Sequence, residues 1–476
     1  IVITLLCKYP AWDSKKKDSN GRPNKPRHEK WFYAWIIGIA VLGGTWAFFL
    51  PIAINSGFGK DDDGAALRQA LIYTTGGILG VITLGETHRK NTLEKTKNDQ
   101  DHTRQVHAER RSRYTTAVEQ LSSDKASIRL GGVYTLVGLV DEWLSDEKTT
   151  PTLEERRKEG QVIINNLCAY IRSPFPLAER AEQLDKDYAK DLQNDFDGDI
   201  EKFDADKRAF ARDKAALEEE RQVRESIIKE IRERLQDFGA PGLWSEFDYD
   251  FSNAHFFYPI VFTNSYFDAS SRFFGATFTQ AADFSGTTFT GYANSIGYAN
   301  FSGATFTQGA YFIGATFTQG ANFSEATFTE GADFFGATFT QAADFSRATF
   351  TQGAYFIGAT FTQAADFSRA TFTQHASFFD ATFTEGADFF DATFTQHANF
   401  SRAIFHSEPS FTDVLGKARF SHKVAPESYS FGVNPDSPCK IEIEEQEHNG
   451  VKFIIPKGTE LFDPDEPSDL EDDDES

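Results

Sequence analysis

The sequence predicts a multi-domain protein in which two membrane-spanning helices and a helical module precede a β-helix with about 22 residues per coil. Three observations carry this prediction. A short repeat fills the stretch from about Phe251 to Phe411, two apolar runs lie near the N-terminus, and charged segments with helical periodicity lie between them. A fixed short period indicates stacked units, each of which covers the apolar face of its neighbour.

The repeat has a period of eleven residues, made of two similar half-units. Its phenylalanines are separated by alternating steps of six and five residues, and most have an alanine two places earlier. Examples are Phe306, Phe312, Phe317, Phe323, Phe328, Phe334 and Phe339. Since side chains alternate in an extended chain, the Phe and this Ala point inward while the flanking Thr point outward.

The coil length follows from the core that the coil must enclose. Like must stack on like, so a coil is a multiple of eleven residues. Eleven residues cannot enclose a Phe-filled core, whereas twenty-two can, as four short sides with one Phe each. About seven coils at roughly 4.8 Å each give a rod of roughly 35 Å. The small residues Gly309, Gly320, Gly331 and Ala342 are expected at the corners.

Several half-units resemble the pentapeptide-repeat family, whose pattern is Ala-(Asp/Asn)-(Leu/Phe)-X-X. Ala282-Asp283-Phe284-Ser285-Gly286, Ala321-Asn322-Phe323-Ser324-Glu325 and Ala332-Asp333-Phe334 match it. The resemblance implies a right-handed, four-sided β-helix. The family repeats in strict fives, whereas every second unit here has six residues, so we expect a bulged corner on two sides. A local irregularity is expected at Ala293-Asn294-Ser295, where Ser replaces Phe.

The N-terminal region is predicted to cross the membrane twice. A basic segment, 1–30, precedes a first apolar helix at 31–54, and a second follows at 67–84. Both are long enough to span a bilayer, although a buried globular helix is the alternative for the second. Basic residues flank the outer ends and the intervening loop is acidic, so the positive-inside rule places both termini in the cytoplasm.

A cytoplasmic helical module is predicted at 86–240. Its helical runs resemble the segment that precedes the repeats in many bacterial membrane-anchored pentapeptide-repeat proteins, and we interpret them as a small pair resembling a HEAT-type repeat. A charged insertion at 177–221 is predicted to form an antiparallel, coiled-coil-like helical hairpin that turns at Asp197-Gly198. Its two apolar faces are Leu177, Ala181, Leu184, Tyr188 and Leu192, and Ile200, Phe203, Phe210 and Leu217.

The β-helix is predicted at 246–420, with a cap at each end. The helix before it covers one end, since an open end exposes strand edges and Phe. A C-terminal cap at 421–462 contains a hairpin of Ile441–Glu445 and Val451–Ile455, joined across Asn449-Gly450. The acidic tail at 463–476 is expected to be solvated.

Composition and motifs argue against an enzyme. The formal net charge of −23 disfavours direct nucleic-acid binding. The cysteines Cys7, Cys168 and Cys439 lack metal-ligand spacing and suggest reduced thiols in the cytosol. Phosphate-loop, dinucleotide and nucleophile motifs are missing, so we expect no catalytic, cofactor-binding or metal-binding residues. The expected partners are the lipid bilayer and another protein, and a homo-oligomer is left open.

The most favoured function is therefore a membrane-anchored scaffold that presents the β-helix. Two alternatives stay open: a DNA mimic that binds a topoisomerase, and an ice-binding Thr-x-Thr surface like those of insect proteins. A continuous outward carboxylate stripe along a dimeric rod would favour the DNA mimic.

The 22-residue coil also predicts vertical contacts between coils. Phe334, Phe356 and Phe378 should stack on one side, and Phe345, Phe367 and Phe389 on another. Glu325, Arg347, Arg369 and Asp391 should form one outer line, Asp380 should pair with Arg402, and His375 should stack on His397.

Overall fold

The computed structural model describes residues 28–53, 63–189, 192, 195–197, 199–291, 299–414 and 416–466. Its helices are α2 (His28–Ala53), α3 (Asp63–Leu121), α4 (Ala126–Ser145), α5 (Leu153–Arg172), η1 (Pro176–Arg180), α6 (Ala181–Asp185), α7 (Ile200–Arg234) and η3 (Pro426–Ser428). Most of the basic N-terminal segment, the 54–62 loop and the acidic tail beyond residue 466 lie outside the described residues, so those predictions stay untested. Two compact units divide between His107 and Ala108.

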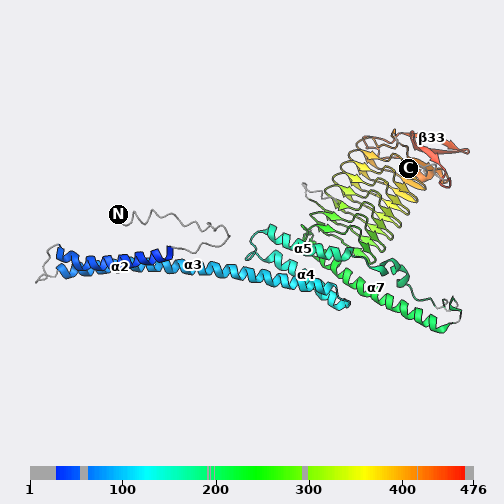
Figure 1. The fold of residues 1–476 in the computed structure, drawn as a ribbon. Helices are drawn as coiled ribbons and strands as arrows, with labels where there is room; N and C mark the ends of the chain where they lie inside the picture. Colours follow the sequence, from blue (N-terminus) through cyan, green and yellow to red (C-terminus); the bar gives the residue numbers. More distant parts are fainter. Residues whose placement is uncertain are drawn as a thin grey trace, which may run out of the picture. The chain divides into compact units, whose positions relative to one another are not determined.

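The first unit contains α2 and the apolar part of α3, which lie side by side (Figure 1). They approach closely at Gly43, where an added Cβ would lie 2.3 Å from the Thr75 Cγ2. The predicted second span and the charged stretch after it are one continuous helix, α3. Among the described residues, one helix, Arg68–Leu121, is long and apolar enough to cross a membrane, and the apolar part of α2, Trp35–Leu50, is shorter.

The second unit begins with a helical module of α4, α5 and α7. Apolar residues at three- and four-residue spacing bury one face of each helix. The buried side chains include Val133, Leu136, Val140, Ile164, Leu167, Val223, Ile227 and Ile231. The N-terminal turns of α5 are fixed by Thr152, whose side chain accepts a hydrogen bond from the Glu155 backbone N–H.

The charged insertion is not the predicted hairpin of two helices. Its second arm is the helical start of α7, but its first arm is helical in η1 and α6 and non-helical at the described residues 186–189 that follow. Pro176 is the first residue of η1, a position that suits proline, and α6 ends at Asp185. The turn is confirmed at Asp197, which has a φ of 49°. Tyr188 still packs on α7, with its ring 5.2 Å from that of Phe210.

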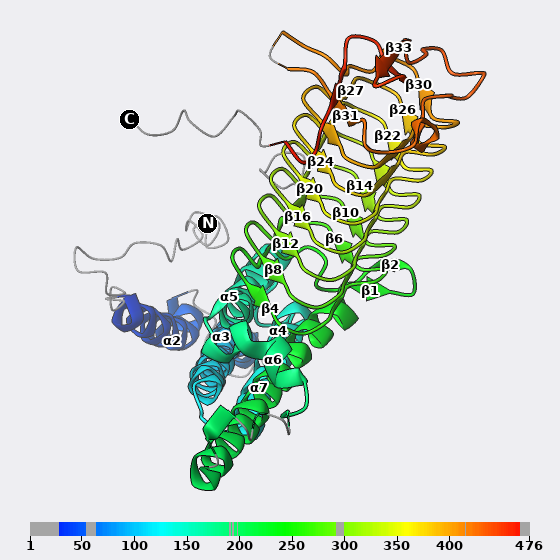
Figure 2. The same cartoon turned by 90° about the vertical axis from the view of Figure 1, so that its right-hand side faces the viewer.

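The repeats form a β-solenoid of short strands (Figure 2). The strands pair in parallel and fall into four sheets. Sheet 1 contains β3 (Tyr249–Asp250), β7 (Ser271–Arg272), β11 (Ala299–Asn300), β15 (Ala321–Asn322), β19 (Ala343–Asp344), β23 (Ala365–Asp366) and β27 (Ala387–Asp388). Sheet 2 contains β4 (His255–Phe256), β8 (Thr277–Phe278), β12 (Thr305–Phe306), β16 (Thr327–Phe328), β20 (Thr349–Phe350), β24 (Thr371–Phe372), β28 (Thr393–Phe394), β31 (Arg419–Ser421) and β35 (Glu460–Phe462).

The other two sheets follow sheets 1 and 2 along each coil. Sheet 3 contains β5 (Ile260–Val261), β9 (Ala282–Asp283), β13 (Ala310–Tyr311), β17 (Ala332–Asp333), β21 (Ala354–Tyr355), β25 (His375–Ser377), β29 (His397–Asn399) and β32 (Tyr429–Ser430). Sheet 4 contains β6 (Tyr266–Phe267), β10 (Thr288–Phe289), β14 (Thr316–Phe317), β18 (Thr338–Phe339), β22 (Thr360–Phe361), β26 (Thr382–Phe383) and β30 (Ile404–Phe405).

The predicted 22-residue coil is confirmed by the strand register. Thr305 pairs with Thr327, and Ala332 pairs with Ala354. The spacing grows in the C-terminal coils, where Thr393 pairs with Arg419 and Ala398 with Tyr429. An earlier coil is also longer, because Thr288 pairs with Thr316, which is 316 − 288 = 28 residues later. The irregularity expected at 293–295 lies inside this coil but outside the described residues, and the six extra residues agree with it.

Two kinds of corner explain the alternation of five and six. One is a three-residue link, such as Thr307-Gln308-Gly309. The other is a β-turn from Phe to Ala, as in Phe312–Ala315, where the Ala315 N–H donates to the Phe312 carbonyl at 3.0 Å. The third residue of this turn has a positive φ, for example 62° at Gly314 and 57° at Arg347.

The glycines singled out in the sequence are therefore not the ones that the backbone requires. Gly309, Gly320 and Gly331 do lie in the three-residue corners, but none has a positive φ. Ala342 and His375 occupy the equivalent place, so the backbone there accepts a Cβ, although at Gly309 a Cβ would lie 2.5 Å from the Tyr311 hydroxyl. The demanding position is the third turn residue, where left-handed backbone favours glycine.

The core is a set of stacked phenylalanine rings. Phe356 stacks on Phe334 at 4.8 Å and on Phe378 at 5.1 Å, and Phe367 stacks on Phe345 at 5.0 Å and on Phe389 at 5.1 Å. Both predicted stacks are confirmed.

Each end of this core is covered. Helices α5 and α7 contact the first coil, through β3, β4 and β5. At the other end lies the predicted hairpin, β33 (Ile443–His448) with β34 (Val451–Pro456), whose Phe453 and Ile455 are buried. A further small pair, β1 (Gln236–Asp237) and β2 (Ala240–Pro241), precedes the solenoid.

Candidate functional site

The outer faces of the solenoid are the main candidate for a functional surface. Sheets 2 and 4 present the predicted Thr arrays, since Thr305, Thr327 and Thr349 lie in register on sheet 2 and Thr316, Thr338 and Thr360 on sheet 4. These arrays are regular, as the period requires. The regular spacing alone does not point to ice, so that alternative stays a prediction.

Sheet 1 carries an acidic column that is short. Its outward residues on successive coils are Asn300, Asn322, Asp344, Asp366 and Asp388. Each has a structural role, because its Oδ1 accepts the backbone N–H two residues later, as Asp366 does from Ser368 at 2.8 Å. Burial, together with the neighbouring Asp366 and Asp413, raises the pKa of the Asp388 carboxyl above its usual value.

The turns between sheets 1 and 2 form what we call the charged edge. Its third turn residues are Gly303, Glu325, Arg347, Arg369 and Asp391. Arg347 pairs with Glu325 at 3.2 Å, and Arg369 pairs with Asp391 at 3.6 Å. The predicted vertical line is confirmed, and its side chains are exposed, so each pair contributes at most about 1 kcal/mol.

The turns between sheets 3 and 4 form what we call the apolar edge. The second turn residues on four successive coils are Ile313, Phe335, Ile357 and Phe379. They are adjacent, since the N–H of the third turn residue donates to the carbonyl of the second turn residue one coil later, as Gly314 does to Phe335 at 2.8 Å. Phe335 is 53% exposed and Ile313 is 38% exposed.

In the last two turns of the apolar edge the third turn residue is charged. Arg402 pairs with Asp380 at 3.4 Å, as predicted, and its guanidinium lies 5.3 Å from the Phe379 ring centroid. Only the charged positions of this edge were predicted from the sequence, and the apolar ones were missed. The signal was present, because Ile and Phe recur at a spacing of 22 where other turns have Ser.

The predicted histidine pair is confirmed. His375 pairs with His397 in register, and their ring centroids are 5.5 Å apart. Burial, reinforced by the His397 imidazole, lowers the pKa of His375 below its usual value. Within the described residues, no group of three or more His, Cys, Asp or Glu side chains could hold a metal ion.

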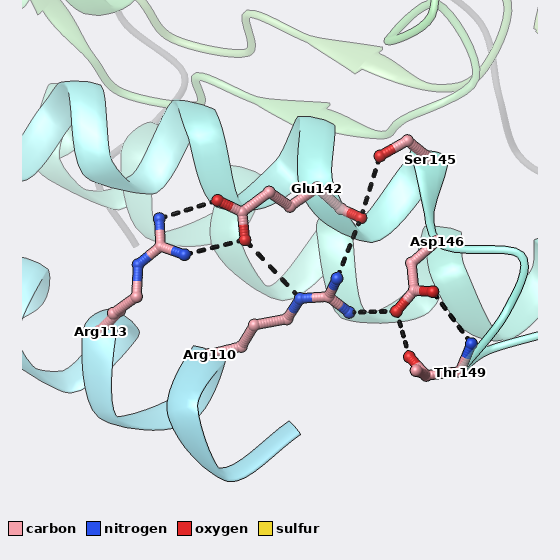
Figure 3. Close-up of polar contacts among 6 residues, drawn as sticks. All are labelled: Arg110, Arg113, Glu142, Ser145, Asp146 and Thr149. Atoms are coloured by element: carbon pink, nitrogen blue, oxygen red, sulfur yellow. Dashed lines mark hydrogen bonds and ion pairs between the residues drawn. The ribbon is translucent and has the colours of Figure 1, made fainter. Parts of the chain in front are cut away.

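A second candidate is the ionic clamp between the end of α3 and α4 (Figure 3). Arg110 donates to the Asp146 carboxylate at 2.7 Å and packs over the Trp143 ring at 4.6 Å. Arg113 donates to Glu142 at 2.9 Å. Burial alone would raise the pKa of Asp146, but hydrogen bonds from Thr149 and Arg110 outweigh it and hold the pKa well below its usual value. The clamp fixes the last turns of α3 to the helical module.

A third cluster joins the module to the first coil. Arg224 is almost fully buried, and it donates to Glu220 at 2.7 Å, to the Ile171 carbonyl at 2.6 Å and to the Ser173 carbonyl at 2.8 Å. Its guanidinium also lies 5.5 Å from the centroid of Phe257, the residue after β4. With its charge paired and its N–H groups hydrogen-bonded, Arg224 has a structural role in holding the helical module against the first coil.

Comparison with known proteins agrees with the repeat geometry. The family model described as Pentapeptide repeats (9 copies) matches residues 296–338 and 334–382. A search of curated proteins and a search of solved structures each gave no match. The matched segments lie within the stacked coils and share their Ala-(Asp/Asn)-Phe half-units. The repeat region of this chain is therefore a pentapeptide-repeat β-solenoid.

Proposed function

We propose that this protein is a non-enzymatic, membrane-anchored scaffold whose solenoid binds another protein in the cytoplasm. The observation that carries the proposal is the course of α3. This one helix contains both the apolar segment that is long enough to cross a membrane and the arginines of the clamp. The clamped module in turn packs on the first coil of the solenoid, so the chain links an anchor segment to a rigid display surface.

Exposed apolar side chains on the first unit support the membrane anchor. On α2 they include Trp35, Ile37, Val41, Leu42, Trp46, Phe48 and Phe49, and on α3 Ile72, Tyr73, Ile78, Val81 and Leu84. Contiguous exposed apolar surface of this kind marks a membrane or protein contact. The proposal includes α2 as a second span, with both termini in the cytoplasm, and a right-handed, four-sided coil with one strand of each sheet per turn.

The acidic pattern favours a protein scaffold over a DNA mimic. A DNA mimic needs a continuous outward carboxylate stripe. On sheet 1 the first two outward positions of the column are the uncharged Asn300 and Asn322, and carboxylates begin only after them. On sheet 3 the stripe of carboxylates is broken by Tyr311, Tyr355 and Ser377. Arg347 and Arg369 stand beside the sheet 1 carboxylates. The charge is thus spread over the molecule and does not copy the spacing of phosphates.

Native cysteines allow a direct test of the topology. Cys439 is partly exposed in the C-terminal cap, whereas Cys168 is buried. In a Cys7→Ser background, an impermeant thiol reagent should label Cys439 only after the cells are permeabilised, and Cys439→Ser should abolish that labelling. Labelling in intact cells contradicts a cytoplasmic solenoid. Recovery of the protein in the soluble fraction contradicts the anchor itself.

The partner is then sought from detergent-solubilised membranes. The full chain is compared with a variant in which three charged-edge residues are replaced (Glu325→Ser, Arg347→Ser, Arg369→Ser), which leaves the core intact. Proteins lost from the variant bind that edge. Recovery of a topoisomerase with the unaltered chain would favour the DNA mimic over the scaffold.

A further inference from the structure

The two turn edges of the solenoid share one backbone design but have opposite surfaces. On the charged edge the second turn residue is Ser in four successive coils, Ser302 to Ser368, and the third is Gly or a charged residue. On the apolar edge the second residue is Ile or Phe in four successive coils, and the third is Gly in the first three of them, at Gly314, Gly336 and Gly358.

The bare glycines are not required by crowding. A Cβ added at Gly314, Gly336 or Gly358 would meet nothing within 4 Å. The same left-handed position accepts Arg347 and Arg369 on the other edge, although that backbone conformation is less favourable for them than for glycine. The chain therefore places long side chains at this position on one edge and leaves it without a side chain beside the exposed Ile313 and Phe335 and the half-buried Ile357 of the other.

We propose that the apolar edge binds a second copy of this chain in an antiparallel, two-fold symmetric pair. The order along the edge is Ile313, Phe335, Ile357, Phe379. Under a two-fold axis between the second and third coils, each Phe faces an Ile: Phe335 meets Ile357 of the second copy, and Phe379 meets Ile313. A two-fold interface must be self-complementary in this way, and alternating large and small side chains satisfy it.

The neighbouring column on sheet 3 is compatible with the same register. Its outward residues are Tyr311, Asp333, Tyr355 and Ser377 on the same four coils. The axis places Asp333 opposite Tyr355 of the second copy, so no two carboxylates of this column face one another. The Tyr355 hydroxyl itself lies back over Gly353, away from the apolar edge. A shift of one coil that centres the axis on Phe335 would oppose the two Asp333 carboxylates, so charge repulsion disfavours it.

The size of the edge sets the expected strength. Four side chains per copy fall short of the roughly 800 Å² per partner that a standard interface buries. The pair is therefore weak and dependent on concentration. This inference does not depend on the membrane anchor or on the identity of any other partner.

The test uses complementary charges in the full chain, purified in detergent, with mass measured by light scattering over a concentration series. Phe335→Glu and Ile357→Lys should each shift the chain to monomer, raising the apparent Kd at least about tenfold. An equimolar mixture of the two variants should dimerise again. In the mixed pair the new Glu at 335 of one chain faces the new Lys at 357 of the other, and the second central contact keeps its original Ile357 and Phe335. Phe274→Glu is the matched control, since Phe274 occupies the same turn position on the charged edge and is 49% exposed.

Three results overturn the proposal. The first is an unaltered chain that stays monomeric up to its solubility limit. The second is a Phe335→Glu variant that self-associates like Phe274→Glu. The third is a mixture that stays monomeric although each variant keeps the circular dichroism of the unaltered chain, which would show that these two positions do not face one another.

Discussion

Replacing Phe356 by alanine tests the closed aromatic core most directly. The ring is fully buried and has six aromatic neighbours. It stacks on two rings at 4.8 and 5.1 Å, meets three more edge-on at 5.2, 5.2 and 6.0 Å, and meets the sixth at 6.3 Å. Burial of a Phe is worth about 3–5 kcal/mol against alanine, and the cost is highest where the site cannot collapse.

The coils around Phe356 cannot close over a cavity without breaking the ladder between them. The Phe356 N–H donates to the Ser377 carbonyl at 2.7 Å, and the Phe334 N–H donates to the Tyr355 carbonyl at 2.7 Å. These bonds fix the coil spacing, so we expect Phe356→Ala to cost about 4 kcal/mol, in the upper part of the range.

Hydrogen exchange is the appropriate assay, because a repeat array opens locally and a single unfolding midpoint would average over all coils. Exchange of the Phe334 and Phe356 amides should accelerate roughly a thousandfold. The control Phe274→Ala removes an exposed ring at a turn and should change local stability by less than about 0.5 kcal/mol. A loss below about 1 kcal/mol for Phe356→Ala would refute the closed core.

Three further predictions concern backbone strain and charge. Arg347→Gly and Arg347→Ala both remove the ion pair with Glu325, but only Gly adopts a φ of 57° without strain, so the Gly variant should be more stable by about 1 kcal/mol in denaturant titration; equal stabilities would contradict the strain. Because the pKa of His375 is lowered in the folded chain, the imidazole is protonated in the unfolded chain before it is protonated in the folded chain as the pH falls. Stability should therefore fall as pH drops below about 6.5, and His375→Gln should reduce that slope in thermal melts. The lowered pKa of Asp146 contributes stability above its unfolded pKa of about 3.9, which is lost as pH falls below that value. Asp146→Asn should remove this contribution, and an unchanged acid profile would show that the clamp is not closed in solution.

The repeat made much of the solenoid predictable. Because every coil obeys one period, a single deduction about coil length fixed the stacks of Phe334 and Phe345, the pairing of Arg347 with Glu325 and the contact of His375 with His397. The same periodicity hid the turn chemistry. Asp344 and Asp366 recur as outward residues, and their bonds to the following backbone N–H groups become visible only when the turn geometry is known.

The helical module was less predictable, since its contacts join distant residues. Arg110 and Asp146 are 36 residues apart and Arg224 reaches Ile171 across 53, and no local pattern marks either pair. The first arm of the insertion at 177–221 failed for a different reason. Apolar spacing suggested one long helix, but the polar stretch after Asp185 does not sustain it, and Tyr188 packs on α7 from a non-helical segment.

The third turn residue has a consequence for how such a protein changes over evolutionary time. Its side chain points away from the Phe core, and the backbone accepts Gly, Glu, Arg or Asp there, as Gly336, Glu325, Arg347 and Asp391 show. Substitution at this site and at the residue before it rewrites the surface while every buried Phe and Ala stays in place. Two descendants of one solenoid can therefore keep an identical interior and recognise unrelated molecules, because the surface of each coil can change independently of the others.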